Sequence, residues 1–153
     1  MRVRTPEFHP ILAVIDMQNG FCAHGGSYEK FGASIGVDIN IYRKIIPNVK
    51  RIIDVCHELR IPVFYTQQVR EASGIDLLTR LHRIIPRRRL EFTKIPACVR
   101  GTWDAEIIDE LLPAKNDHIV IKRRDSAFQD TEFELWLKSM IFLYIFISAP
   151  NFS

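Results

Sequence analysis

Two charged residues stand where buried strands are expected to end. Asp16 directly follows the apolar run 11–15, and Lys122 directly follows the mostly apolar stretch 118–121. Such runs are typical of strands buried on both faces of a parallel sheet. A carboxylate can accept a proton and an ammonium group can hold an anion, so together they could activate a nucleophile. Taken alone, each has a plainer interpretation: Asp16 as a loop cap and Lys122 as part of a solvated basic edge.

Other groups with catalytic or metal-binding potential are scattered. Cys22, Cys56 and Cys98 have neither metal-ligand nor disulfide spacing. Cys56 falls on the apolar side of an expected helix, where a packed thiol is the ordinary outcome, whereas Cys22 could approach a site near Asp16. The histidines form no H-x-H or D-x-H pair, so we expect no metal. We also expect no disulfide, which favours a cytoplasmic location.

Alternating strands and helices must position Asp16 and Lys122. The expected strands are short apolar runs, and they lie at 11–15, 61–66 and 118–121. The expected helices have apolar residues at helical spacing, and they lie at 42–59, started or kinked at Pro47, at 103–112 and at 131–140. Between residues 67 and 101 the periodicity weakens, with one short helical candidate at 75–81. This alternation predicts a doubly wound parallel α/β sheet, whose ligands bind beyond the carboxyl ends of the strands.

The length and net charge of the chain limit the number of domains and the classes of binding partner. The 153 residues fit a single domain spanning 1–153, and a hydrophobic content of 47% is enough for a sizeable core. A net charge of +3 demands no polyanion, and the run Arg87–Arg89 lacks the interleaved aromatics of a nucleic-acid site. The longest apolar stretch, Met140–Pro150, is shorter than the roughly 20 residues of a membrane helix. We therefore expect no nucleic-acid or membrane partner.

Three blocks of sequence resemble the isochorismatase-like cysteine hydrolases. The blocks are Val14–Phe21, Gly101–Ile107, and Val120–Lys122 followed by Ser126–Phe128 and Thr131. The resemblance covers about residues 8–140 and implies a Rossmann-like three-layer α/β/α domain. It also implies a hydrolase without cofactors that acts on a small amide, ureido or carbamoyl compound. Gly101–Asp104 looks most like the carbamoylsarcosine amidase and ureidoacrylate amidohydrolase branch, and complete family members commonly form homo-oligomers.

The resemblance also assigns roles to residues. Family enzymes use an Asp, a Lys and a Cys, and the match makes Asp16 the base and Lys122 its cationic partner. It places Gln18, Phe21 and Trp103 at the substrate. The nucleophile is expected in a Gly-Val-x-Thr-x-x-Cys stretch after the fourth strand, and residues 141–153 contain no Cys. We therefore expect a truncated fold, incomplete at the C-terminus, whose missing nucleophile leaves it inactive.

Two other functions stay open. Isochorismatase proper hydrolyses a vinyl ether with an Asp and needs no Cys. A non-catalytic relict or binding module would keep the pocket without the chemistry. For residues 141–153 we expect an atypical tail, because 141–147 combines high β-propensity with no charge. Such a tail would be exposed, and it would aggregate or pack against another copy.

Overall fold

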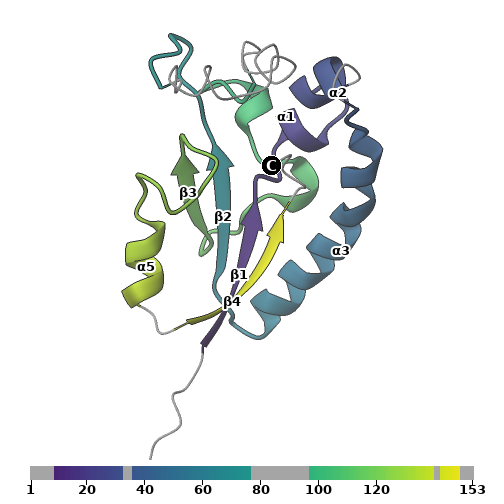
Figure 1. The fold of residues 1–153 in the computed structure, drawn as a ribbon. Coiled ribbons are helices and arrows are strands. Elements are labelled where there is room, and N and C mark those ends of the chain that lie inside the picture. The colour runs from purple at the N-terminus through teal and green to yellow at the C-terminus, as the bar shows by residue number, and fades with distance from the viewer. Residues whose placement is uncertain (1–8, 33–35, 77–96, 140–141, 149–153) are drawn as a thin grey trace, which may run out of the picture.

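Four parallel strands form the centre of the molecule. The structure is a computed structural model that describes residues 9–32, 36–76, 97–139 and 142–148, the last of these as backbone only. The strands are β1 (His9–Ile15), β2 (Val63–Gln68), β3 (His118–Lys122) and β4 (Phe142–Ser148). They lie in the order β3-β2-β1-β4 (Figure 1), and all three pairings are parallel. The predicted parallel α/β sheet and its first three strands are confirmed.

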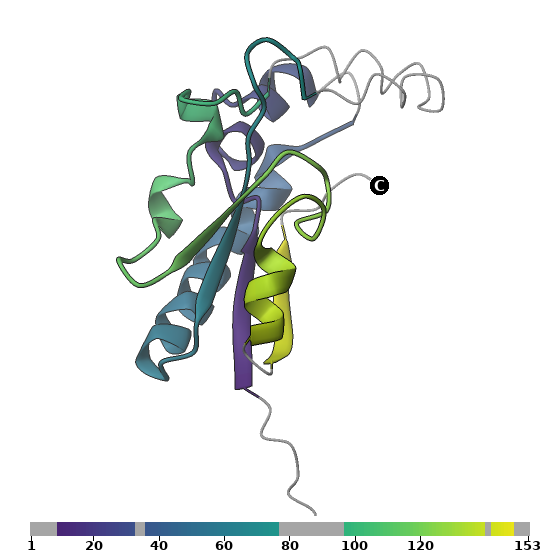
Figure 2. The same ribbon diagram turned by 90° about the vertical axis from the view of Figure 1, so that its left-hand side faces the viewer.

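Helices cover both faces of this sheet. The long helix α3 (Ile39–Glu58) lies on one face and α5 (Phe133–Ser139) on the other (Figure 2). Two short helices, α1 (Asn19–Cys22) and α2 (Ser27–Gly32), follow β1. The Asp38 side chain caps α3 by accepting a hydrogen bond from Asn40 N. Pro47 lies inside α3 rather than at its start, and the layers have the predicted α/β/α order.

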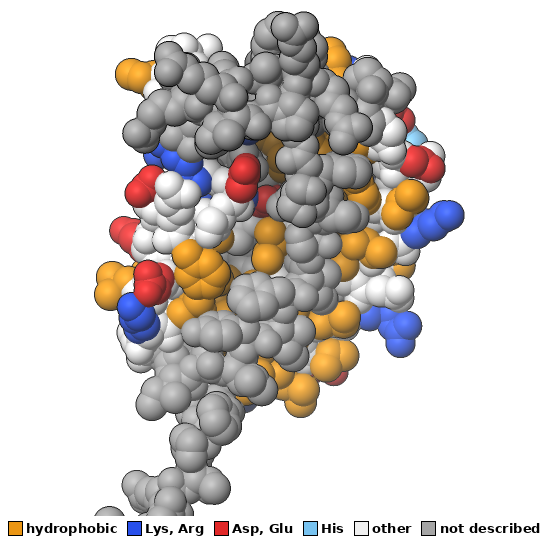
Figure 3. All heavy atoms as spheres, viewed as in Figure 1, with side chains coloured by type: hydrophobic (Ala, Val, Ile, Leu, Met, Phe, Trp, Pro, Cys, Tyr) orange, Lys and Arg blue, Asp and Glu red, His pale blue; other side chains and the backbone are white. Residues whose placement is uncertain are grey.

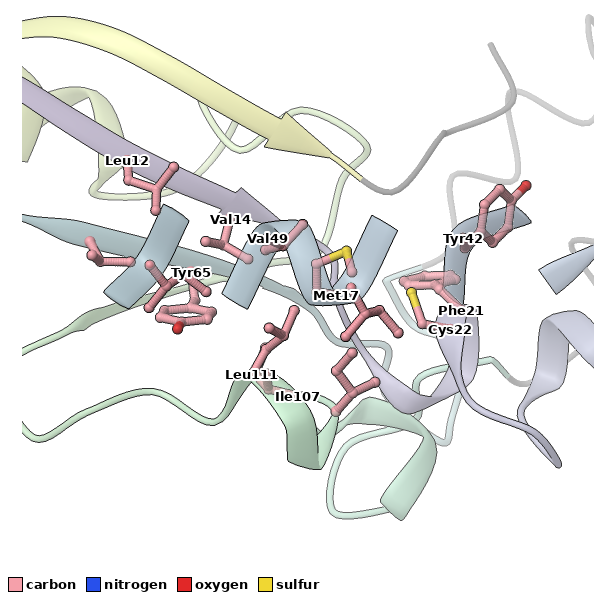
Figure 4. Packing of buried hydrophobic residues seen from close by; sticks show 14 of the residues in the cluster. Leu12, Val14, Met17, Phe21, Cys22, Tyr42, Val49, Tyr65, Ile107 and Leu111 are labelled. Carbon is pink, nitrogen blue, oxygen red and sulfur yellow. The ribbon is translucent and has the colours of Figure 1, made fainter. Parts of the chain in front are cut away.

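The larger apolar core lies between α3 and the sheet. One side of α3 buries Tyr42, Ile46, Val49, Ile53 and Cys56, and the sheet contributes Leu12, Val14 and Tyr65 (Figure 4). Burying one such aliphatic side chain contributes roughly 1.5–3 kcal/mol. A smaller cluster on the opposite face joins Phe64 and Val120 to Phe133 and Leu137 of α5. The core therefore fixes the strands whose ends carry Asp16 and Lys122.

The helix predicted at 103–112 is wrong. This segment contains two 3-10 turns, η3 (Trp103–Ala105) and η4 (Asp109–Leu111), joined by extended backbone. Asn19 N donates to Glu106 O at 2.9 Å, and Ile108 N donates to Met17 O at 3.0 Å. Because these groups pair with the loop after β1, they cannot form a helical ladder. Tertiary pairing outweighs the local helical spacing here, and the candidate helix at 75–81 falls mostly outside the described residues.

The segment expected to be an atypical, exposed tail contains a regular strand at residues 142–148. They form β4, which pairs with β1 along its whole length, from His9↔Phe142 to Ile15↔Ser148. The high β-propensity and lack of charge in this stretch suit a strand beside β1. Among the described strands β4 is at one edge of the sheet, so its outer backbone groups have no described strand beside them.

The outer side of α3 is unusually apolar for a surface. Ile41, Ile52, Val55 and Leu59 are all exposed there, and hydrophobic side chains gather along this helix in Figure 3. A shallow hollow lined by Asn48, Arg51, Ile52 and Val55 lies on the same surface. None of the described helices is long and apolar enough to cross a membrane. The predicted self-association is untested and stays a prediction.

Candidate active site

The structure brings Asp16 and Lys122 together. Lys122 Nζ lies 2.7 Å from Asp16 Oδ2, and neither side chain has any exposed surface. Asp16 follows β1 and Lys122 ends β3, whereas β2 lies between these strands. The Lys122 side chain therefore crosses the end of β2 to reach the carboxylate. A buried ion pair now occupies the carboxyl ends of the strands, where the sequence placed both residues.

Asp16 is held in an unfavourable backbone conformation. Its φ is 54°, in the left-handed region that costs most residues roughly 1–2 kcal/mol. Thr66 on β2 stabilises this geometry, because Asp16 N donates to Thr66 Oγ1 at 3.1 Å and to Thr66 O at 3.2 Å. Thr66 Oγ1 in turn donates to Asp16 Oδ1 at 2.6 Å. Left-handed residues tied down in this way are common at functional sites.

Two backbone carbonyl groups hold the Lys122 ammonium group in addition to Asp16. Besides its contact with Asp16, Nζ donates to Arg124 O at 3.2 Å and to Asp125 O at 3.0 Å. Asp16 Oδ2, by contrast, accepts no directed hydrogen bond. The ammonium group is thus fixed in place, while one buried carboxylate oxygen keeps lone pairs for an incoming proton.

Gln68 lies next to Lys122, and the sequence analysis gave it no role. It is the register partner of Lys122 on the neighbouring strand, so both side chains lie on one face of the sheet. The residue is only 7% exposed, yet its side-chain amide makes no hydrogen bond to any described residue. The signal in the sequence was the strand alternation, which puts Gln68 on the same face as Thr66 at the end of β2.

The three residues expected at the substrate have different surroundings. Gln18 is fully buried, and its side-chain amide makes hydrogen bonds to the backbone. Its Nε2 donates to Gln68 O at 2.8 Å and to Ala105 O at 2.7 Å, and its Oε1 accepts from Gln68 N at 2.7 Å. Phe21 packs in the core, edge-on to Tyr28. Trp103 is 48% exposed. Gln18 therefore fixes the end of β2, and substrate binding by Gln18, Phe21 and Trp103 stays a prediction.

Asp104 joins the loops around the pair. Its carboxylate accepts hydrogen bonds from Ser27 N at 3.0 Å, Ser27 Oγ at 2.8 Å and Cys98 N at 2.7 Å. A Cβ at Gly20 would lie 2.6 Å from Asp104 Oδ2, so this close approach requires glycine. The sequence analysis quoted Asp104 within a block but gave it no role. In the structure it holds the loop after β1 against the loop before η3.

None of the three cysteines has the surroundings of a ready nucleophile. All are free and buried. Burial raises the pKa of Cys22 to about 12 and also raises that of Cys56. Burial, together with the charges of Asp104 and Asp16, raises the pKa of Cys98 as well. These thiols therefore stay protonated at neutral pH. Across the described ranges, no group of three His, Cys, Asp or Glu residues could hold a metal ion.

Known protein sequences match most of this chain. A sequence model of the isochorismatase domain matches residues 10–141. The ureidoacrylate amidohydrolase RutB of Serratia proteamaculans is 30% identical over 135 residues, which cover 84% of this chain and 53% of that protein. The chain thus spans about half the length of the curated relatives it matches.

Solved structures share the fold. A cysteine hydrolase from Pseudomonas syringae superposes with a TM-score of 0.71 at 20% identity, covering 97% of this chain and 63% of that one. The N-carbamoylsarcosine amidase of Thermoplasma acidophilum gives a TM-score of 0.64 at 21% identity, with 92% of this chain and 65% of that one covered. At these identities the likeness establishes the arrangement of strands and helices alone.

Proposed function

The chain belongs to the isochorismatase family, and on that premise we propose that Asp16 and Lys122 form the reaction centre of a hydrolase for a small amide, ureido or carbamoyl C–N bond. The observation that carries the proposal is their fully buried ion pair at the ends of β1 and β3. Removing two charges from water is expensive, and a buried pair often stabilises a fold less than apolar residues would. Such a pair at a ligand-binding edge is better explained by chemistry than by stability.

Two observations support the substrate class: the names of the relatives, and the position of the Gln68 side-chain amide. RutB is named for ureidoacrylate, and the Thermoplasma enzyme for N-carbamoylsarcosine. Both compounds present a carbonyl and N–H groups in one plane. The Gln68 side chain, next to Lys122 in register, has a donor and an acceptor that no described residue uses. In this proposal Gln68 orients the substrate while Asp16 and Lys122 act on it.

The proposed reaction uses a thiol. Asp16 Oδ2 takes the thiol proton, and Lys122 holds the resulting charges in place. The thiolate attacks the carbonyl carbon, the C–N bond breaks, and the leaving nitrogen receives the proton from Asp16. Water then hydrolyses the intermediate, which is a thioester from an amide and a thiocarbamate from a ureido or carbamoyl substrate. A Cys in a segment that continues from β4 would supply the thiol in this proposal, because the register Ile15↔Ser148 puts the ends of β1 and β4 side by side.

A second candidate reaction needs no thiol. The three described cysteines are buried, and burial raises the pKa values of Cys22 and Cys98. These observations favour vinyl-ether hydrolysis with Asp16 as the acid. Release of ammonia distinguishes the reactions, because only the C–N reaction on an amide or terminal ureido group produces it.

The test is a grafted chain. The residues after Ser148 are replaced by a Gly-Val-x-Thr-x-x-Cys segment of the family type, and ammonia release from N-carbamoyl compounds is measured. We expect the grafted chain to release ammonia from these compounds. We expect no release with the ungrafted 153-residue chain, or with a graft that carries Ser in place of the new Cys. A grafted chain that unfolds cooperatively but releases no ammonia contradicts the proposal.

A further inference from the structure

The outer side of α3 carries a regular stripe of side chains, which we call the α3 stripe. Its members follow one another at alternating intervals of four and three residues, and they are Ile41, Ile45, Asn48, Ile52, Val55 and Leu59. Ile45 is half-buried at the margin of the core, and the other four apolar members are between 40% and 65% exposed. Alternating intervals of three and four residues are the spacing at which one helix packs along another. The α3 stripe therefore has the form of a helix–helix contact surface.

The middle of the stripe is hollowed. The hollow is lined by the polar residues Asn48 and Arg51 and by the apolar residues Ile52 and Val55. Side chains of a second helix pack into such grooves between the side chains of the first. A single polar residue in an apolar seam, such as Asn48, favours one register of pairing over the others.

The charged residues of α3 differ in whether they have partners. On the side away from the stripe they pair within the chain, as Arg43–Glu110, Lys50–Asp54 and His57–Asp117. Three exposed charged residues follow the edge of the stripe instead, and they are Lys44, Arg51 and Glu58. Their intervals of seven residues return each of them to nearly the same side of the helix. None of the three forms a hydrogen bond or an ion pair with a residue that the structure describes.

The order of the stripe fits a reversed copy of itself. Its intervals read the same from either end, so a twofold axis at its midpoint superposes the stripe on that of a second, antiparallel helix. The axis brings Ile41 opposite the partner's Leu59, and Ile45 opposite the partner's Val55. Apolar residues therefore meet apolar residues over most of the length of the helix.

The unpaired charges are complementary under the same axis. A twofold axis sets the charged edge of one stripe beside the same edge of the other. Lys44 then lies within about 3 Å, measured along the helix axis, of the level of the partner's Glu58, and the symmetry repeats this contact at the other end. The two Arg51 residues come near each other at the axis, where the amide oxygen of the partner's Asn48 offers each guanidinium group an acceptor.

We propose that α3 is the docking surface for a second copy of this chain, which pairs antiparallel along the α3 stripe. Removal of the exposed apolar side chains from water supplies the affinity. The charges select the direction, because a reversed copy presents an acidic residue to Lys44 and a basic residue to Glu58. The pairing involves none of the residues at the Asp16–Lys122 centre.

The test uses two charge reversals in the 153-residue chain, Lys44→Glu and Glu58→Lys. Each variant alone puts like charges at both ends of the pair. We therefore expect the dissociation constant of the dimer, measured by sedimentation equilibrium, to rise at least about tenfold in each variant. An equimolar mixture of the two variants has opposite charges at both ends, and we expect it to form heterodimers as tightly as the unsubstituted chain forms its dimer. Lys50→Glu is the matched control, because it makes the same change of charge on the side of α3 that pairs within the chain, and it should leave the dissociation constant unchanged.

Three results would overturn the proposal. The first is an unsubstituted chain that stays monomeric at high micromolar concentration. The second is an equal dissociation constant in the unsubstituted chain and both reversed variants, which places the interface elsewhere, such as the outer edge of β4. The third is association that weakens in both variants and is not restored in their mixture, which means that Lys44 and the partner's Glu58 do not face each other. Circular dichroism verifies that the variants, which change exposed residues, keep the fold.

Discussion

Lys122 Nζ reaches Asp16 Oδ2 at 2.7 Å across a strand that belongs to neither residue. At the end of β2, the Thr66 side chain donates a hydrogen bond to the carboxylate, and Gln68 is the register partner of the lysine. Three strands that are far apart in the sequence therefore contribute to one buried cluster. The position of the cluster at the carboxyl edge of a parallel sheet is where this architecture binds its ligands.

The ion pair predicts a strongly non-additive mutant cycle. Lys122→Met leaves a buried carboxylate without its cation and should destabilise the fold by about 3–5 kcal/mol. Asp16→Asn keeps a residue type that tolerates the positive φ, so it removes mainly the charge. The double variant should recover most of the loss, because neither charge then remains unpaired. Urea unfolding measures all four proteins, and additive effects would contradict a coupled pair.

Thr66 provides a second test of the geometry. Thr66→Val preserves the shape and strand propensity but removes the hydroxyl that bridges Asp16 N and Oδ1. We expect a loss of about 1–3 kcal/mol in unfolding free energy, since two buried polar groups lose a partner. The control is Thr102→Val, which removes an exposed hydroxyl bonded to Val99 O. Equal effects of the two substitutions would mean that the Thr66 hydroxyl is not specifically required.

Much of this arrangement could be predicted from the sequence, and the misses have physical causes. Asp16 and Lys122 were placed correctly because buried parallel strands are continuous apolar runs. The 103–112 segment buries Ile107, Ile108 and Leu111, but backbone pairing with Met17 and Asn19 replaced the expected helix. Gln68 and Asp104 were missed since their roles depend on which strands and loops become neighbours, and local periodicity does not contain that information.

The strand β4 predicts slow hydrogen exchange in a segment that the sequence analysis expected to be exposed. Peptides covering Phe142–Ser148 should exchange more slowly than the exposed loop at Glu71–Gly74, because half of the β4 backbone groups face β1. Hydrogen exchange with mass spectrometry makes the comparison. Equal, rapid exchange in both segments would show that β4 does not pair with β1 in solution.

The buried thiols predict a loss of stability in alkali. The pKa of Cys22 is raised to about 12 in the folded protein, whereas an unfolded thiol ionises near 8.5. Between these values the unfolded state releases the proton and the folded state keeps it. The free energy of unfolding should therefore fall with rising pH, by about 1.4 kcal/mol per unit for each such thiol. Cys22→Ala should reduce the slope by that amount, and an unchanged slope would place the thiol in contact with water.

The most direct test of the central claim is the effect of Asp16→Asn on ammonia release by the grafted chain. If the buried pair is a reaction centre, kcat should fall at least about a thousandfold, while a cooperative unfolding transition shows that the fold is retained. A folded Asp16→Asn protein that releases ammonia at the rate of the unsubstituted graft would mean that the Asp16–Lys122 pair is an element of the fold and takes no part in catalysis.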